Sequence, residues 1–180
     1  MSDDELIIVA NRLPVEAVTD SDGNVSWNVS PGGLVAAVEP SLKGRQGVWI
    51  GWNGHYQDPS EPSMPPIPET AEGRDYRIVE VPLDRADVEQ YYDGFSNSAL
   101  WPLYHDAIAT PTYHRHQFDA YRRVNMLFAQ AAARAAAPGA TVWIHDYQLQ
   151  LVPAMLRSLR PDLRIGFFLH IPFPPEEIFA

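Results

Sequence analysis

At 180 residues, of which 46% are apolar and 11% aromatic, the chain is long enough for a well-packed core and too apolar to be disordered. Its net charge of −10 argues against nucleic acid or an anionic membrane surface as a partner. The sequence has no cysteine, which excludes disulfides and thiolate chemistry within it. No stretch approaches the ~20 apolar residues of a membrane span, and no signal peptide is evident, so we expect a soluble cytoplasmic protein.

Alternating apolar runs and turn signals predict an α/β chain. Short apolar runs are typical of buried strands, and longer stretches with apolar residues three or four apart are typical of helices. The first elements expected are a strand at 5–10, a hairpin at 16–30, a glycine turn with a short helix at 30–42, and strands at 47–51 and 76–83 around a proline-rich surface loop at 57–74. Next we expect a helix at 84–92 capped by Asp84, an aromatic segment at 95–105 in which Pro102 limits any helix, and a long helix at 117–137.

The stretch from Thr141 to Pro175 predicts a strand, a helix and a second strand. Its two apolar runs, at 141–144 and 165–169, are separated by apolar residues at helical spacing, with Pro153 tolerable only in the first turn. This order and length are typical of a right-handed crossover in a parallel sheet, and strands so apolar are expected to be covered on both faces. The predicted fold class is therefore α/β, a Rossmann-like parallel sheet with helices on both faces.

Polar side chains follow three of the predicted strands, at the edge where open α/β sheets bind ligands. Arg12 follows the first strand, where its guanidinium could pair with a phosphate. Asp146 and His170 follow the last two strands and are expected in one crevice, the candidate active site. The same positions also fit a solvated arginine and purely structural polar residues. The sequence offers no serine elbow, which disfavours a Ser-His-Asp hydrolase.

Two weaker signals come from glycines and aromatic residues. Gly32 and Gly33 precede a helix and could bring backbone amides to an anionic ligand, although most such turns are structural. Aromatic residues normally belong to the core, but their faces also line carbohydrate sites. From the residues alone, the chain is interpreted as a phosphate- or sugar-binding half of an α/β enzyme.

The histidines allow a metal hypothesis that the pattern does not support. His114 and His116 are close in sequence to His105, but no helix or strand pattern places them on one face. We therefore expect no metal. His145 is expected to be a packed or hydrogen-bonded core histidine rather than a catalytic one.

Six segments, spread over the whole chain in the family's order, resemble the trehalose-6-phosphate synthases. The resemblance implies a retaining glycosyltransferase of GT-B architecture, in which two Rossmann-like domains face each other across a cleft. Members transfer glucose from a nucleotide sugar, usually UDP-glucose, to glucose-6-phosphate and form trehalose-6-phosphate, and no cofactor is called for. The segments are VANRLPV (9–15), SPGGLVAAVEP (30–40), GVWIGWNG (47–54), YYDGFSNSALWPLYH (91–105), VWIHDYQLQLVP (142–153) and IGFFLHIPFPPEEIF (165–179).

The resemblance also implies an acceptor site. Arg12 is expected to bind the phosphate of glucose-6-phosphate, with Tyr92 and Asp146 on the same sugar and Trp52 at the wall of the site. Asp146 is further expected to take part in catalysis by orienting the acceptor. These assignments agree with the independent placement of Arg12 and Asp146 at one sheet edge.

On the donor side, Gly32 and Gly33 match the glycine pair whose backbone reaches the nucleotide sugar. Trp101 and His170 match positions associated with selecting the α anomer. The family mechanism needs no protein nucleophile, because the acceptor hydroxyl attacks the face that the nucleotide diphosphate leaves. The protein contributes position and charge stabilisation.

Residues 1–180 correspond to the family's N-terminal, acceptor-binding domain. The C-terminal nucleotide-sugar domain has no counterpart in them, and a helix that begins at Pro174-Pro175 is cut short by the last residue. The sequence is therefore expected to be the front part of a longer protein. On their own, residues 1–180 are expected to bind glucose-6-phosphate weakly and to transfer no glucose.

Two alternative functions remain open at this stage. One is a relative with another acceptor, such as a glucosylglycerol-phosphate synthase or an enzyme that couples cyclitols. The other is a non-catalytic protein that binds sugar phosphates. The sequence does not decide between UDP, ADP and GDP as donor nucleotide, nor whether the protein forms a homo-oligomer.

Overall fold

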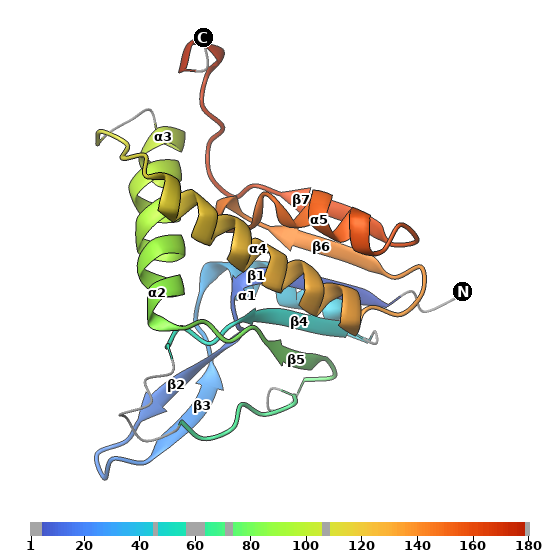
Figure 1. The fold of residues 1–180 in the computed structure, drawn as a ribbon. Coiled ribbons are helices and arrows are strands. Elements are labelled where there is room, and N and C mark those ends of the chain that lie inside the picture. Colours follow the sequence, from blue (N-terminus) through green and yellow to red (C-terminus); the bar gives the residue numbers. More distant parts are fainter. Residues whose placement is uncertain (1–4, 45–46, 57–63, 71–73, 106–108, 179–180) are drawn as a thin grey trace.

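The computed structural model describes residues 5–44, 47–56, 64–70, 74–105 and 109–178. Its central feature is a five-stranded sheet in which all neighbouring strands are parallel, in the order β5-β4-β1-β6-β7 (Figure 1). The chain adds β4 and β5 on one side of β1, then crosses back and adds β6 and β7 on the other. This confirms the predicted Rossmann-like fold class. The strands are β1 (Leu6–Arg12), β4 (Gly47–Trp52), β5 (Arg77–Glu80), β6 (Thr141–His145) and β7 (Arg164–Phe168).

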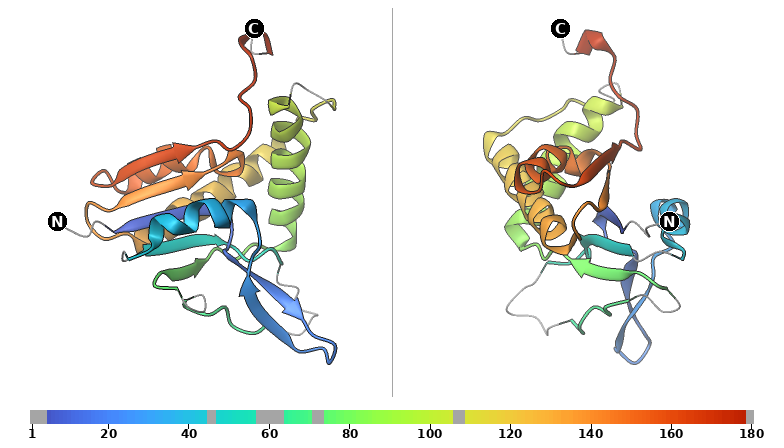
Figure 2. Two further views of the ribbon diagram at one scale, coloured as in Figure 1. Left: turned by 180° about the vertical axis from the view of Figure 1, so that it is seen from behind. Right: turned by 90° about the vertical axis from the view of Figure 1, so that its right-hand side faces the viewer.

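Helices cover both faces of this sheet and one of its ends. On one face lie α1 and η1, and on the other lie α4 and α5 (Figure 2). A third helical run, α2–η2–α3, stands across the end of the sheet at which the strands finish (Figure 1). The helices are α1 (Gly33–Val38), η1 (Glu39–Leu42), α2 (Arg85–Asp87), η2 (Val88–Leu100), α3 (Trp101–Tyr104), α4 (Arg115–Ala135), η3 (Tyr147–Leu149), α5 (Val152–Leu159) and η4 (Glu176–Ile178).

The predicted hairpin is present and projects from the main sheet. It consists of β2 (Val15–Thr19) and β3 (Val25–Val29), which pair antiparallel as a separate two-stranded sheet. Trp27 joins the hairpin to the following loop by donating its indole N–H to the carbonyl of Pro65 at 3.1 Å. Residues 64–70 of the predicted proline-rich loop contain no helix, whereas 57–63 and 71–73 lie outside the described residues.

The strand β1 is the centre of the core, because successive side chains of a strand point to opposite faces. Ile7 and Val9 pack in the cluster formed with α4, η2 and α5. Leu6, Ile8 and Ala10 pack in a second cluster with α1 and η1. All five side chains are buried, as expected for a strand covered on both faces.

The strand β7 does not fit that expectation. It is the outermost strand of the described sheet, and Phe167 and Phe168 are 40% and 49% exposed. The prediction that both strands of the crossover are covered on both faces is therefore right for β6 and wrong for β7 within the described residues. An apolar run indicates that a strand can be buried, but it does not say which neighbour covers it.

The segment after Asp84 also differs from the prediction. Asp84 caps the first turn as expected, with Oδ1 accepting from the backbone N–H of Asp87 at 2.7 Å. The helix then continues far past Tyr92 to Tyr104, so the prediction that Pro102 limits any helix there is wrong. Pro102 lies in the first turn of α3, where α-helical turns follow the wider turns of η2. A proline lacks an N–H donor and its ring crowds the carbonyl of the preceding turn, and the change from wider to α-helical turns is a place where both effects are tolerated.

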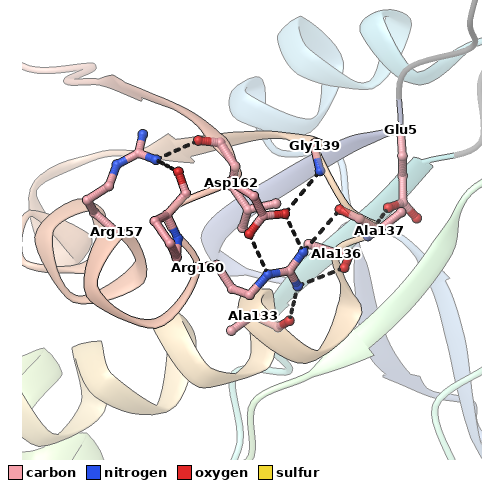
Figure 3. Close-up of polar contacts among 10 residues, drawn as sticks. Glu5, Ala133, Ala136, Ala137, Gly139, Arg157, Arg160 and Asp162 are labelled. Carbon is pink, nitrogen blue, oxygen red and sulfur yellow. Dashed lines mark hydrogen bonds and ion pairs between the residues drawn. The ribbon is translucent and has the colours of Figure 1, made fainter.

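The loop between α4 and β6 is held by charged side chains from the loop between α5 and β7 (Figure 3). Arg160 donates to the carbonyls of Ala133 and Ala136, at 2.8 and 3.0 Å, and so satisfies groups left free at the end of α4. Asp162 pairs with Arg160 at 2.8 Å and accepts from the backbone N–H of Gly139 at 3.1 Å. These contacts connect two crossover loops at the end of the sheet opposite the candidate site.

Asn125 is a fully buried polar residue that joins α4 to the chain between β6 and α5. Its Nδ2 donates to the carbonyls of Tyr121 and Gln148, both at 2.9 Å, and its Oδ1 accepts from the backbone N–H of Leu151 at 3.1 Å. The carboxamide thus satisfies backbone groups of a buried segment whose regular structure is limited to the single turn of η3. That segment directly follows Asp146, so Asn125 fixes the chain on one side of the candidate site.

We expect Asn125→Leu to lower the free energy of unfolding by about 3 kcal/mol, because it leaves buried donors and acceptors without partners. The matched control is Asn28→Leu on the exposed side of β3, for which the change should stay within about 0.5 kcal/mol. Chemical denaturation of both variants measures the difference. Equal losses in the two variants would contradict the structural role of Asn125.

Candidate active site

Residues from β1, β4 and β6 meet at the carboxyl end of the sheet. The chain leaves β1 toward β4 on one side, whereas β6 is added on the other, so the connections diverge between β1 and β6. Such a reversal in strand order opens a crevice, and open α/β sheets bind their ligands there. Arg12 ends β1, and Asp146 directly follows β6. The structure therefore places both residues at the switch point, as the sequence predicted.

The guanidinium of Arg12 lies close to an aromatic ring and to a glycine. Its Cζ is 5.1 Å from the centre of the Trp52 ring. Gly54, at φ +91°, is also close, because an added Cβ there would come within 2.0 Å of Arg12 Nη2. The residue is exposed, and no carboxylate of the described chain forms an ion pair with it. The arrangement holds the guanidinium in place and leaves its charge available for an anion.

An aromatic wall extends from Arg12 to the helix η2. The rings of Trp52 and Tyr92 meet edge to face, with their centres 5.5 Å apart. Behind them, Tyr91 is fully buried and donates its hydroxyl to Oδ1 of Asn11 at 2.7 Å. Because Asn11 is next to Arg12 in β1, this hydrogen bond fixes η2 over the end of the strand that carries Arg12.

Asp146 links the ends of β6 and β7. It adopts φ 74°, the only positive φ among the described non-glycine residues. Its Oδ1 accepts from the backbone N–H groups of Tyr147, at 3.0 Å, and His170, at 3.3 Å. An unusual backbone conformation fixed by several bonds is common at functional sites. The structure thus brings Asp146 and His170 together, as predicted.

His145 is a buried and hydrogen-bonded core histidine, as predicted. Its Nδ1 lies 2.9 Å from Nε2 of the exposed His170, a partner that the sequence did not indicate. The two rings are stacked, with centres 5.2 Å apart. Burial, followed by the effect of His170, lowers the pKa of His145 to about 4.

The remaining predicted residues lie further from these contacts. Trp101 in α3 is 40% exposed and packs on His105 and Tyr147, at 4.0 and 5.5 Å between ring centres. Gly32 and Gly33 are exposed at the start of α1, and an added Cβ at Gly33 would meet nothing within 4 Å. No described contact connects these residues to Arg12 or Asp146, so their proposed roles stay predictions.

Two of the histidines that suggested a metal site lie at the start of α4. His114 and His116 have stacked rings with centres 5.5 Å apart, and both are exposed. Within the described ranges, no group of three or more histidine, aspartate or glutamate side chains is arranged to hold a metal ion. No helix in the same part of the chain is both long and apolar enough to cross a membrane.

Sequence reasoning missed Gly54, Asn11 and the partnership of His145 with His170. The dipeptide Asn53-Gly54 is a turn signal that announces a positive φ, but nothing in the sequence shows that Arg12 lies against it. Asn11 precedes Arg12, and the sequence alone gives no sign that its side chain accepts a hydrogen bond from Tyr91. The two histidines are 25 residues apart, and only the parallel pairing of β6 with β7 brings them together.

The fold and these side chains define an open Rossmann-like α/β domain that presents an arginine, aromatic rings and a carboxylate at its switch point. The model of the family described as Glycosyltransferase family 20 matches residues 4–180. Because this match covers nearly the whole chain, the chain belongs to glycosyltransferase family 20. The family expected from the sequence motifs is thereby confirmed.

Individual relatives agree with this assignment. The trehalose-6-phosphate synthase of Mycolicibacterium gilvum (strain PYR-GCK) is 58% identical over 175 residues, which are 97% of this chain and 34% of that protein. The trehalose-6-phosphate synthase of Mycobacterium tuberculosis (strain ATCC 25618 / H37Rv) is 55% identical over 177 residues, or 98% and 35% of the two chains. The chain thus spans about a third of the length of the curated relatives that it matches.

Solved structures show the same similarity in three dimensions. A UDP-forming alpha,alpha-trehalose-phosphate synthase from Burkholderia xenovorans, in complex with glucose-6-phosphate, superposes with a TM-score of 0.76 at 35% identity and covers 97% of this chain and 35% of that chain. An E. coli structure bound with UDP-2-fluoro glucose gives a TM-score of 0.77 at 33% identity, over 97% and 35% of the two chains. The fold of this chain therefore corresponds to one part of these larger structures.

We expect Gly54→Ala to weaken the binding of a phosphorylated ligand at Arg12 roughly tenfold to a hundredfold, because a Cβ there displaces the guanidinium. The matched control is Gly23→Ala in the hairpin turn, where φ is +85° and an added Cβ meets nothing within 4 Å. Both variants carry a similar backbone strain, about 1–2 kcal/mol. Calorimetric titration of the complete protein with glucose-6-phosphate measures the effect, and equal affinities in the two variants would show that Gly54 does not position Arg12.

The lowered pKa of His145 predicts a loss of stability in acid. In the unfolded chain this histidine takes up a proton near its ordinary pKa of 6.5, whereas the buried ring does so only near about 4. Between these values the unfolded state binds more protons, so the free energy of unfolding falls as the pH is lowered through that window. The test compares the fall in Tm between about pH 7 and about pH 5 in the wild type and in His145→Asn. The variant should show the smaller fall, and identical falls would contradict the burial of a neutral His145.

Proposed function

We propose that the complete protein is a retaining glucosyltransferase that moves glucose from a nucleotide sugar, UDP-glucose, to glucose-6-phosphate and forms trehalose-6-phosphate. The observation that carries the proposal is the guanidinium of Arg12, which lies against Trp52 and Gly54 at the same sheet edge as Asp146 and forms no ion pair with the residues that the structure describes. The names of the relatives and the glucose-6-phosphate complex of the Burkholderia xenovorans enzyme support it. In this proposal residues 1–180 form the acceptor-binding domain.

The acceptor is bound at its two ends by different chemistry. Arg12 binds the phosphate, because a guanidinium offers two parallel N–H donors to an oxyanion. Tyr92 and Trp52 form the wall against which the sugar ring packs, and their edge-to-face contact keeps that wall in place. Asp146 accepts hydrogen bonds from sugar hydroxyls with Oδ2, since among the described residues the backbone N–H groups of Tyr147 and His170 engage only Oδ1. Phosphate and hydroxyl recognition together fix the orientation of the acceptor.

The reaction needs no nucleophile from the protein. The bond between the anomeric carbon of glucose and the diphosphate breaks, and the anomeric hydroxyl of glucose-6-phosphate forms a new bond on the same face. The proton of that hydroxyl passes to the departing phosphate. Orientation of the two substrates supplies a large part of the rate enhancement in such a transfer. His170 and Trp101 contact the sugars and select the α anomer, and the backbone at Gly32 and Gly33 contacts the nucleotide sugar.

A product assay tests the proposal directly. The complete protein is incubated with UDP-glucose and either glucose-6-phosphate or glycerol-3-phosphate, and the products are separated. Trehalose-6-phosphate from the first mixture and no product from the second are expected. A glucosylglycerol phosphate product would replace the proposed acceptor, and no transfer to any phosphorylated acceptor would favour a non-catalytic binding protein. A cytoplasmic location and the oligomeric state stay predictions.

We expect Arg12→Lys to raise the KM for glucose-6-phosphate by roughly tenfold to a hundredfold, which corresponds to about 1.5–3 kcal/mol. Lysine keeps the positive charge but cannot present two parallel donors to the phosphate. The KM for UDP-glucose should stay near its original value. Arg122→Lys on the exposed side of α4 is the matched control. An unchanged acceptor KM, measured by UDP release, would remove Arg12 from the phosphate site.

A further inference from the structure

The proposed mechanism gives no role to His145, although this residue is hydrogen-bonded to His170. His145 ends β6 and is fully buried, whereas His170 follows β7 and is exposed at the candidate site. Only two ring nitrogens face each other, Nδ1 of His145 and Nε2 of His170, at 2.9 Å. One of the two must carry the proton that makes this bond.

The surroundings of the other nitrogen of His145 decide which one it is. Nε2 of His145 is buried and has no hydrogen-bond partner among the residues that the structure describes. A proton on Nε2 would be a buried donor without an acceptor, which is rare in proteins, whereas a bare Nε2 leaves only an unused lone pair. A neutral histidine has one N–H, so the proton belongs on Nδ1, and His145 donates to His170.

This assignment determines the state of His170. Its Nε2 accepts the bond from His145, so a neutral His170 carries its own proton on Nδ1. The ring is also held in orientation, because it lies against Phe168 at 4.7 Å and His145 at 5.2 Å between centres, and its backbone N–H donates to Asp146. Trp143 packs on the other ring of the pair, at 4.6 Å from His145. The hydrogen bond from His145 therefore fixes the tautomer of His170, and the neighbouring rings and the backbone hydrogen bond fix the angle of its ring.

We propose that His145 is a positioning residue, which holds His170 as the Nδ1–H tautomer so that His170 offers an N–H donor to a sugar hydroxyl of the bound substrates. The inference about the tautomer depends only on the contacts of the two rings. The inference about the sugar rests on the proposed function. His145 itself touches no substrate, since it is buried behind His170.

The first test measures the tautomers without any assay of activity. The complete protein is labelled with ¹⁵N-histidine, and two-dimensional spectra that correlate ring nitrogens with ring carbon-bound protons identify which nitrogen carries the proton. Signals are assigned with His145→Asn and His170→Gln. We expect the proton on Nδ1 in both histidines. A proton on Nε2 of either one would overturn the proposal.

The second test compares two variants of the same shape. Asparagine at position 145 places an amide N–H near the position of Nδ1 and can still donate to His170, whereas leucine cannot. We expect His145→Leu to lower kcat roughly tenfold, which is the factor for the loss of one orienting hydrogen bond. The KM for glucose-6-phosphate should change little, and His145→Asn should recover most of kcat.

The outcomes separate this inference from the proposed function. If the protein transfers no glucose at all, the tautomers in the ¹⁵N spectra still confirm or overturn the role of His145. If transfer occurs and the leucine and asparagine variants have equal kcat, the donated hydrogen bond is not used, and the proposal is wrong. Tm values of both variants identify an effect on folding. If His145→Leu fails to fold, the tautomer measurement on the unchanged protein decides the question.

Discussion

The parallel pairing of β1 with both β4 and β6 is the constraint on which the candidate site depends. The same residues of β1 pair on both sides, with Leu6 opposite Gly47 in β4 and opposite Thr141 in β6. All three strands therefore run level and finish at one edge. Since the connections after β1 and β6 turn to opposite sides, that edge is left open between them. Strand register places Arg12 and Asp146 at the same edge of the sheet, although they are far apart in the sequence.

Two buried tyrosines position the helix η2 relative to the strand ends. Tyr91 in η2 bonds to Asn11 at the end of β1, and Tyr147 after β6 bonds to Asn97 in η2, at 2.7 and 2.9 Å. Burial raises the pKa of both phenols, so they stay protonated and remain donors. The helix is thus fixed to two strand ends at once. Tyr92 in η2 and Trp101 at the start of α3 are positioned by these two bonds, because both residues belong to the same helical run.

Much of the fold could be predicted from local patterns, because apolar runs and helical spacing report burial directly. The strands, the hairpin, the cap at Asp84 and the end of α4 all follow from such patterns. The placement of Arg12, Asp146 and His170 needed one more step, the rule that parallel strands end at a common edge. What failed were features that depend on distant parts of the chain. The exposure of Phe167 and Phe168 depends on what covers β7, and the path through Pro102 depends on packing that favours one continuous helix.

The charged residues of the candidate site could be predicted from the sequence, but the residues that hold them in place could not. Arg12 and Asp146 are conspicuous because polar residues at strand ends are easy to recognise. Gly54 and His145 are not, because their importance comes from a neighbour that the sequence does not reveal. Gly54 matters because it has no side chain to displace the guanidinium of Arg12. His145 matters because its buried ring is hydrogen-bonded to His170. Such supporting residues are recognised only in the three-dimensional structure. An added Cβ at Gly54 would lie 2.0 Å from Nη2 of Arg12, and Nδ1 of His145 lies 2.9 Å from Nε2 of His170.

The close packing around Arg12 limits how this part of the chain can vary during evolution. Gly51 faces the backbone of Arg12, and an added Cβ there would lie 2.6 Å from its carbonyl carbon, while Gly54 faces the guanidinium. A side chain at either position would collide with the same arginine, once at its backbone and once at its tip. Gly51 and Trp52 end the strand β4, and Asn53 and Gly54 form the turn that follows it, a place that usually tolerates exchange. Gly54 is limited by the arginine side chain, so it is expected to change only where position 12 is no longer arginine. Gly51 is limited by the backbone of β1, so it is expected to stay glycine whatever residue stands at position 12.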